Sequence, residues 1–78
     1  MTPAQYYVVN RSGAWKIKFR DDLFGPYLNQ AEALRLAIDA AQNLGRRGTK
    51  SQVLIEGEPD HFHAEWTFGQ NPYPPHWA

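Results

Sequence analysis

His61, His63 and Glu65 are the residues whose types and spacing come closest to a chemical site in this chain. Alternate residues of a strand point to the same side, so two imidazoles and a carboxylate would face one way. Zinc takes three or four ligands of these kinds, and His76 in the tail is the other candidate ligand. No wider ligand spacing fixes such a site, so we interpret the three residues as the solvent-facing side of a strand. The sequence therefore predicts no metal and no cofactor, and a weaker interpretation is a histidine pair that gains charge near about pH 6.

Residues that could support other kinds of catalysis are scarce. Asp21 and Asp22 are adjacent carboxylates, but a pair of this kind in a loop is more often a turn signal than a catalytic pair. The sequence has no serine or cysteine nucleophile motif and no glycine-rich phosphate loop. A chain of 78 residues also has little room for a deep pocket. We therefore predict that the chain is not an enzyme.

Length and charge limit the remaining possibilities. The chain is short enough for one domain, which we place at residues 1–70, followed by a proline- and aromatic-rich tail at residues 71–78. Eight basic and eight acidic residues give zero net charge, which disfavours a dedicated nucleic-acid binder. There is no pattern typical of a secretory signal, and no apolar stretch approaches the length of a membrane span. The expectation is a cytoplasmic protein with no membrane partner.

The elements that would position these residues begin with a hairpin. The runs "QYYVVN" and "WKIKFR" flank a Ser-Gly turn, which pairs Asn10 with Trp15. In the second run apolar and basic residues alternate. The pattern predicts that one set faces the core (Tyr6, Val8, Trp15, Ile17 and Phe19) and the other faces outward (Tyr7, Val9, Lys16, Lys18 and Arg20).

A helix follows the segment "DDLFGPYLN", which we interpret as a turn and an extended link. Asn29 is a suitable N-cap, with Glu32 three residues later as in a capping box. The next residues are strong helix formers, with an apolar stripe formed by Leu34, Ala37, Ile38, Ala41 and Leu44. Gly45 or Gly48 ends the helix.

A second hairpin is predicted from "SQVLIEG" and "DHFHAEWTF", with its turn at residues 57–60. We pair Ile55 with Phe62 and Val53 with Ala64. In this register the inward side chains are Phe62, Ala64, Trp66 and Phe68, and the outward ones are Leu54, Glu56, His61, His63, Glu65 and Thr67.

The predicted fold class is α+β, with the order β-β-α-β-β. One helix packs on one face of a four-stranded, mainly antiparallel sheet. The predicted core comprises Trp15, Ile17, Phe19, Leu34, Ile38, Ala41, Val53, Ile55, Phe62 and Trp66. The other face of the sheet has no second layer, and something must meet it: water, the tail or a partner.

Several stretches together resemble a known family. They are "YYVV", Trp15 with Lys16, "NQAEALRLAIDAAQNLG", "VLIEG" and the closing "FGQNPYPP". They are similar to the small bacterial domains of unknown function that form family 2188. Members of that family usually have Tyr and Asp where this chain has Phe68 and Asn71, and a glycine-containing turn where it has "GEPD". The resemblance implies the architecture and a bacterial origin, and it implies no chemistry.

These observations favour a protein-interaction or self-associating module, including a homodimer. The prolines of the tail stiffen it, which lowers the entropy that docking costs, and we expect it to dock through Pro75. The predicted interaction surface comprises Tyr7, Val9, Lys16, Lys18, Leu54, His63, Tyr73 and Trp77.

The alternative partner is nucleic acid, held by basic side chains beside an aromatic ring on an open sheet. Its predicted contacts are Lys16, Lys18, Arg20, Arg46 and Arg47. The zero net charge and the acidic second hairpin (Glu56, Glu58, Asp60 and Glu65) argue against it.

Overall fold

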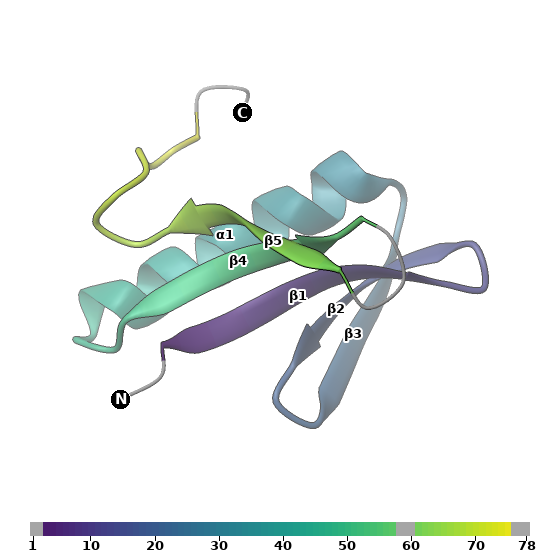
Figure 1. Cartoon of the computed structure of the whole chain (residues 1–78), viewed down its shortest axis with the longest axis horizontal. Coiled ribbons are helices and arrows are strands. Elements are labelled where there is room, and N and C mark those ends of the chain that lie inside the picture. Colours follow the sequence, from purple (N-terminus) through teal and green to yellow (C-terminus); the bar gives the residue numbers. More distant parts are fainter. Residues whose placement is uncertain (1–2, 58–60, 76–78) are drawn as a thin grey trace.

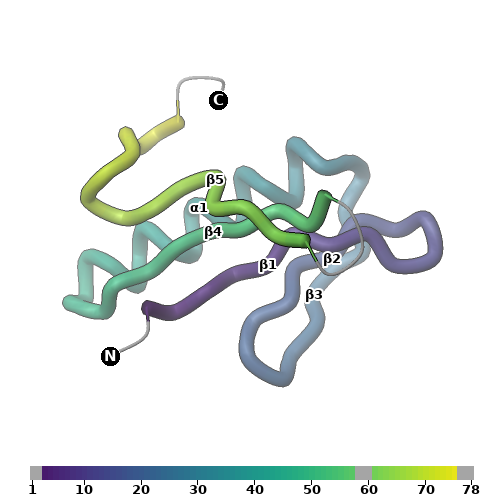
Figure 2. Tube along the Cα trace, in the orientation of Figure 1, coloured from purple at the N-terminus to yellow at the C-terminus, as the bar shows by residue number. Residues whose placement is uncertain are grey.

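The computed structural model describes residues 3–57 and 61–75, which form one helix and a five-stranded mixed sheet (Figure 1). The strands are β1 (Ala4–Arg11), β2 (Ala14–Phe19), β3 (Asp22–Tyr27), β4 (Ser51–Glu56) and β5 (Phe62–Thr67), and the helix is α1 (Gln30–Arg46). The strand order is β3-β2-β1-β4-β5. Strands β1 and β4, which are far apart in sequence, lie side by side and parallel, whereas the other neighbours are antiparallel (Figure 2). No helix of the described residues is long and apolar enough to cross a membrane.

The α+β class with one helix on the sheet is confirmed, but the sheet differs from the prediction in two details: it has five strands rather than four, and it is mixed, with three antiparallel pairs and one parallel pair. The segment Asp22–Tyr27, interpreted as a turn and a link, is the edge strand β3. Its Gly25-Pro26 pair lies where the register shifts, between the pairs Trp15–Tyr27 and Ile17–Phe24. An edge position tolerates proline because one side of the strand needs no ladder donor. The second difference is the parallel pairing of β1 with β4.

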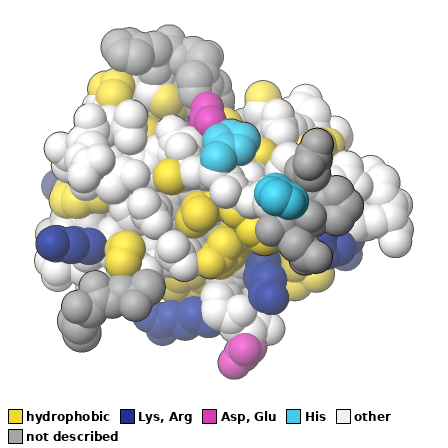
Figure 3. All heavy atoms as spheres, in the orientation of Figure 1, with side chains coloured by type: hydrophobic (Ala, Val, Ile, Leu, Met, Phe, Trp, Pro, Cys, Tyr) yellow, Lys and Arg dark blue, Asp and Glu magenta, His cyan; other side chains and the backbone are white. Residues whose placement is uncertain are grey.

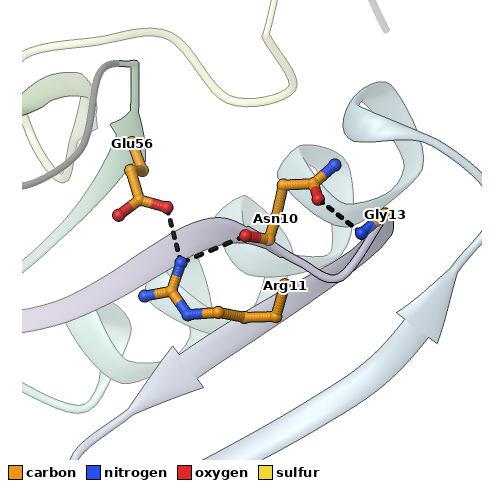
Figure 4. A network of polar contacts seen from close by, with 4 residues as sticks. All are labelled: Asn10, Arg11, Gly13 and Glu56. Carbon is orange, nitrogen blue, oxygen red and sulfur yellow. Dashed lines mark hydrogen bonds and ion pairs between the residues drawn. The ribbon is translucent and has the colours of Figure 1, made fainter.

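The first hairpin forms as predicted, with Asn10 opposite Trp15. Ser12 and Gly13 both have positive φ, 55° and 82°, which is the backbone of the tight turns that match strand twist. The Asn10 side chain accepts a hydrogen bond of 3.0 Å from the Gly13 amide (Figure 4). Tyr7 lies opposite Lys18 and Val9 opposite Lys16, as expected for the outward-facing set.

Helix α1 begins at the predicted cap. The Asn29 side chain accepts a 2.8 Å hydrogen bond from the Glu32 amide, and the Glu32 carboxylate accepts one of 2.7 Å from the Leu28 amide. The first bond satisfies a donor that the first turn would leave unpaired, and the second reaches the residue before the cap rather than the cap itself, unlike a standard capping box. The helix ends at Arg46, and Gly48, with φ of 96°, follows its C-cap.

The core lies between α1 and one face of the sheet. Its buried members are Val8, Ile17, Ala33, Leu34, Ala37, Ile38, Ala41, Val53, Ile55 and Trp66, with Tyr6, Trp15, Tyr27 and Phe68 packed at its margin. Phe19 stacks on Tyr6, with ring centroids 4.1 Å apart. The buried hydroxyl of Ser51 donates a hydrogen bond of 2.6 Å to the Ala41 carbonyl, which ties β4 to the helix.

The predicted register of the second hairpin is wrong. The pairs observed are Glu56 with Phe62, Ile55 with His63, Leu54 with Ala64 and Val53 with Trp66. The register shifts between Val53 and Leu54 because Glu65 is an extra residue in β5, a β-bulge. Trp66 therefore still faces the core, but Phe62 and Ala64 move to the other side of the sheet, and His63 takes a position opposite Ile55. Residues 58–60 of the predicted turn lie outside the described residues.

Gly45, in the last turn of α1, is buried beneath the ring of Phe68. A Cβ built at Gly45 would collide with three atoms of that ring, including its Cγ, rather than with the end of a flexible chain. The contact explains why the helix carries glycine in its last turn. It also fixes the segment that follows β5 against the helix.

We predict that Gly45→Ala lowers the stability of the fold, although alanine is the better helix former by about 1 kcal/mol. Displacing the Phe68 ring should cost about 1–3 kcal/mol, so the net effect is destabilising. Chemical denaturation of a double-mutant cycle provides the measurement. In a Phe68→Ala background the same substitution should become neutral or stabilising, and a stabilising effect in the wild-type background would contradict the packing described.

Candidate functional site

The face of the sheet opposite α1 is not covered by any described element (Figure 1). Hydrophobic side chains gather at its centre, and basic side chains lie around them (Figure 3). On β1, β4 and β5 the register places five apolar residues on this face, which we call the open-face patch: Tyr7, Val9, Leu54, Phe62 and Ala64. Ala14 on β2 and Leu23 on β3 lie on the same face, outside the patch. The patch spans β1, β4 and β5, so it is a continuous surface across three neighbouring strands.

Aromatic contacts organise the centre of the patch. The rings of Tyr7 and Phe62 meet edge to face, with centroids 5.0 Å apart. Val9 is only 1% exposed although no helix covers it, whereas Phe62 is 40% exposed. The Tyr7 hydroxyl donates a 2.7 Å hydrogen bond to Gln5, whose amide donates one of 3.0 Å to Gln52 on β4. These bonds hold Tyr7 in place across the parallel strand pair.

A hollow of about 260 Å³ lies within this surface. It is lined by Tyr7, Val9, Arg11, Lys18 and Phe62, which come from β1, β2 and β5. The lining combines an apolar interior with two cationic side chains. This composition can receive an apolar group that carries, or lies beside, a negative charge.

The charges on this face are unevenly distributed. Arg11 and Glu56 form an ion pair of 2.6 Å that links the end of β1 to the end of β4 (Figure 4). In residues 3–57 and 61–75, neither Lys16 nor Lys18 has a carboxylate within salt-bridge distance. The open face therefore presents two lysines whose charge is not balanced by a described neighbour.

The structure brings together only part of the predicted nucleic-acid surface. Lys16 and Lys18 are on the open face, and Lys18 shares a second hollow with Arg20, in the turn after β2. The Arg20 guanidinium also lies 4.8 Å from the Phe19 ring centroid. Arg46 and Arg47 are exposed at the end of α1, in the other layer of the molecule.

The residues first considered as metal ligands are exposed on or beside β5. His61 and His63 are both exposed, and the His63 Nε2 lies 3.4 Å from the Glu65 carboxylate. Across the described part of the chain, no three histidine, aspartate or glutamate side chains cluster in a way that could hold a metal ion. His76 lies outside the described residues.

The tail packs against its own helix rather than joining the open-face patch. The Trp66 indole donates a 2.9 Å hydrogen bond to the Pro72 carbonyl, and the Tyr73 hydroxyl donates one of 2.7 Å to Asp39 on α1. That hydrogen bond raises the pKa of Tyr73 because it favours the protonated phenol. Pro75 is buried, and Trp77 lies outside the described residues.

The predicted interaction surface is thus divided. Tyr7, Val9, Lys16, Lys18 and Leu54 share the open face, whereas Tyr73 contacts the opposite layer. An unbroken alternation along β5 predicts that Phe62 and Ala64 face the core, whereas the bulge at Glu65 places both on the open face. The signal that a bulge was present is weak, since Glu65 differs little from any solvent-facing strand residue.

A family model described as an uncharacterized protein conserved in bacteria (DUF2188) matches residues 6–68. The chain belongs to this family. The membership inferred from the sequence is therefore confirmed. No curated protein and no solved structure shows a significant match to the chain.

The DUF2188 match runs from β1 to the residue after β5, so it contains every strand and the helix at least in part. All five residues of the open-face patch fall within it. Most of the closing segment "FGQNPYPP", which carried the resemblance most specifically, lies beyond its end at Phe68. The matched region therefore corresponds to the sheet and helix, and the docked tail is added to it.

We predict that a DUF2188 chain shortened to end at Gln70 unfolds at a lower temperature. The deletion removes the Pro72 carbonyl that accepts from the Trp66 indole, and the Tyr73 ring, whose centroid lies 6.4 Å from that of Trp66. It also removes the Asn71 side chain, which accepts a hydrogen bond from the Thr67 amide. Loss of partners for such groups typically costs about 1–3 kcal/mol. Thermal unfolding followed by circular dichroism provides the measurement.

A chain that ends after Pro75 keeps all of these contacts and is the matched control. Equal melting temperatures for the chains ending at Gln70 and at Pro75 would show that the tail adds nothing to the fold.

Proposed function

We propose that this DUF2188 chain is a non-enzymatic, cytoplasmic protein-interaction module that binds its partner with the open face of its sheet. The observation that supports the proposal most strongly is the open-face patch. Sheets with one face in water usually alternate apolar residues on the core side with polar residues on the other. Here Val9, Leu54 and Phe62 interrupt that alternation on three neighbouring strands.

The composition of the patch is suited to a protein interface. Aromatic residues are enriched at the centres of such interfaces, and basic or polar residues at their rims. Tyr7 and Phe62 meet near the centre of this patch, while Lys16 and Lys18 lie beside it on β2. The arrangement is that of an apolar centre with a charged border.

The patch is also held in a defined shape before any partner arrives. Its residues lie on strands rather than loops, and the Arg11–Glu56 and Gln5–Gln52 contacts join β1 to β4 on this same face. A surface that is already ordered loses less conformational entropy on binding. This supports binding of the partner to a preformed surface, rather than folding of this surface when the partner binds.

A second copy of the chain is a less suitable partner than a different protein. In a face-to-face dimer, the Lys16 and Lys18 side chains of both copies would enter one interface. Glu56, a described carboxylate at the border of this face, is already paired with Arg11. Like charges brought together without counter-charges weaken association. A homodimer is therefore the less favoured complex, and the crosslinking experiment distinguishes it from a complex with a different protein.

Nucleic acid is the second candidate, favoured by the hollow that Tyr7, Lys18 and Arg20 share. Stacking of bases needs an exposed ring, but the Tyr7 ring is half-buried and already in edge-to-face contact with Phe62. The zero net charge of the chain also gives little long-range attraction for phosphates. These features make a protein the better-supported partner.

Photo-crosslinking in the host bacterium tests the proposal. A benzophenone side chain replaces Phe62 in the open-face patch or, as control, Leu36 on the outer side of α1; both residues are 40% exposed. We expect irradiation to give discrete protein adducts from position 62 and none from position 36.

An adduct of two copies of the chain would support an interaction module that self-associates. An adduct removed by nuclease would instead establish the nucleic-acid alternative. Absence of adducts at position 62, or equal adducts at both positions, would overturn the proposal.

A further inference from the structure

The hollow in the open face is small, and one side of it is cationic. Tyr7, Val9 and Phe62 provide apolar lining, Lys18 provides positive charge, and Arg11 is ion-paired with Glu56. We propose that this hollow holds one apolar side chain of an acidic peptide segment in the partner protein. The inference rests on the proposed function, because it assigns the chemistry of the partner to the same face.

The size of the hollow points to a side chain rather than a free metabolite. Its volume is about 260 Å³, just below the range of roughly 300–1,000 Å³ that is typical of small-molecule sites. The edge-to-face contact of Tyr7 with Phe62 closes one part of it with aromatic surface. An aromatic or branched aliphatic side chain inserted there would contact both rings and Val9.

The charges around the hollow point to an acidic segment. Arg11 is already neutralised by Glu56 at 2.6 Å, so it contributes little net charge. Lys18 lies opposite Tyr7 and lines the hollow, and Lys16 lies opposite Val9 on the same strand, beside the hollow. Within the described ranges no carboxylate pairs with either lysine. A partner that supplies those carboxylates would complete the pairing and gain specificity from it.

The spacing of the groups suggests the arrangement of the segment. Neighbouring strands are about 4.8 Å apart, and an extended peptide advances about 3.3 Å per residue. An apolar residue seated over Tyr7 and Val9 therefore brings the carboxylates one or two residues away within reach of Lys16 and Lys18. An extended segment with one apolar residue flanked by glutamates satisfies both requirements.

The probe is the peptide acetyl-Glu-Glu-Phe-Glu-Glu-amide, titrated into the ¹⁵N-labelled chain at low salt and followed by NMR. We expect saturable shifts at the amides of Tyr7, Val9 and Phe62, with α1 unaffected. Replacing the central phenylalanine of the peptide with alanine should abolish them. Replacing its glutamates with lysines should weaken binding by about tenfold or more, which equals about 1.4 kcal/mol.

A charge exchange makes the test specific to Lys18. Lys18→Glu should weaken binding of the acidic peptide and restore binding of acetyl-Lys-Lys-Phe-Lys-Lys-amide, an effect that a merely disrupted fold would not produce. Lys50→Glu, at an exposed lysine in the loop before β4, is the control and should leave both affinities unchanged.

The outcomes separate this inference from the proposed function. If the acidic peptide causes no shifts, or shifts confined to α1, while position 62 still crosslinks to a protein, the inference fails and the proposed function stands. If a single-stranded oligonucleotide shifts the patch and the peptide does not, the inference is overturned in favour of nucleic acid. If neither peptide nor crosslink reports contact, both proposals fail.

Discussion

The parallel pairing of β1 with β4 at the centre of the sheet is the constraint on which the rest of the structure depends. Strand β3 runs parallel to both, so the chain must return from one edge of the sheet to its centre before β4 can begin. Parallel strands need a long crossover, usually a helix, and α1 provides it. The helix passes over β2 and β1 on its way and contacts both, which buries that face of the sheet.

The same constraint explains the open face. One crossover helix covers one face of the sheet. The other face is formed by the outward-pointing side chains of the strands, including those of β1, β4 and β5. Because β1 is central, both of its faces are well shielded, and Val8 and Val9 are 0% and 1% exposed. The bulge at Glu65 then sets which residues of β5 join this face. Without it, Phe62 would point toward the helix and the patch would lose its largest exposed ring.

Local sequence patterns predicted correctly those features that depend on neighbouring residues, namely the first hairpin and the start of the helix. The Ser12-Gly13 turn fixed the first hairpin register, and the Asn29–Glu32 pair marked the start of the helix, as the structure confirms. The order of the strands depends on pairing between segments that are far apart in the sequence, such as β1 and β4. The pattern within any one segment does not reveal which other strand it pairs with. Strand β3 was missed because Gly25-Pro26 signals a break, although an edge strand tolerates it. The predicted open face lacked Phe62 and Ala64 because the extra residue Glu65 reverses the side on which the residues before it lie, relative to Trp66.

The central claim is that Phe62 lies on the open face beside Tyr7 rather than beneath the helix. Nuclear Overhauser effects from the Phe62 ring protons test it most directly. The structure predicts strong effects to the Tyr7 ring, whose centroid is 5.0 Å away, and none to Ile38 in the buried face of α1. Effects between Phe62 and Ile38, with none to Tyr7, would contradict the bulge, the open-face patch and the function proposed for it.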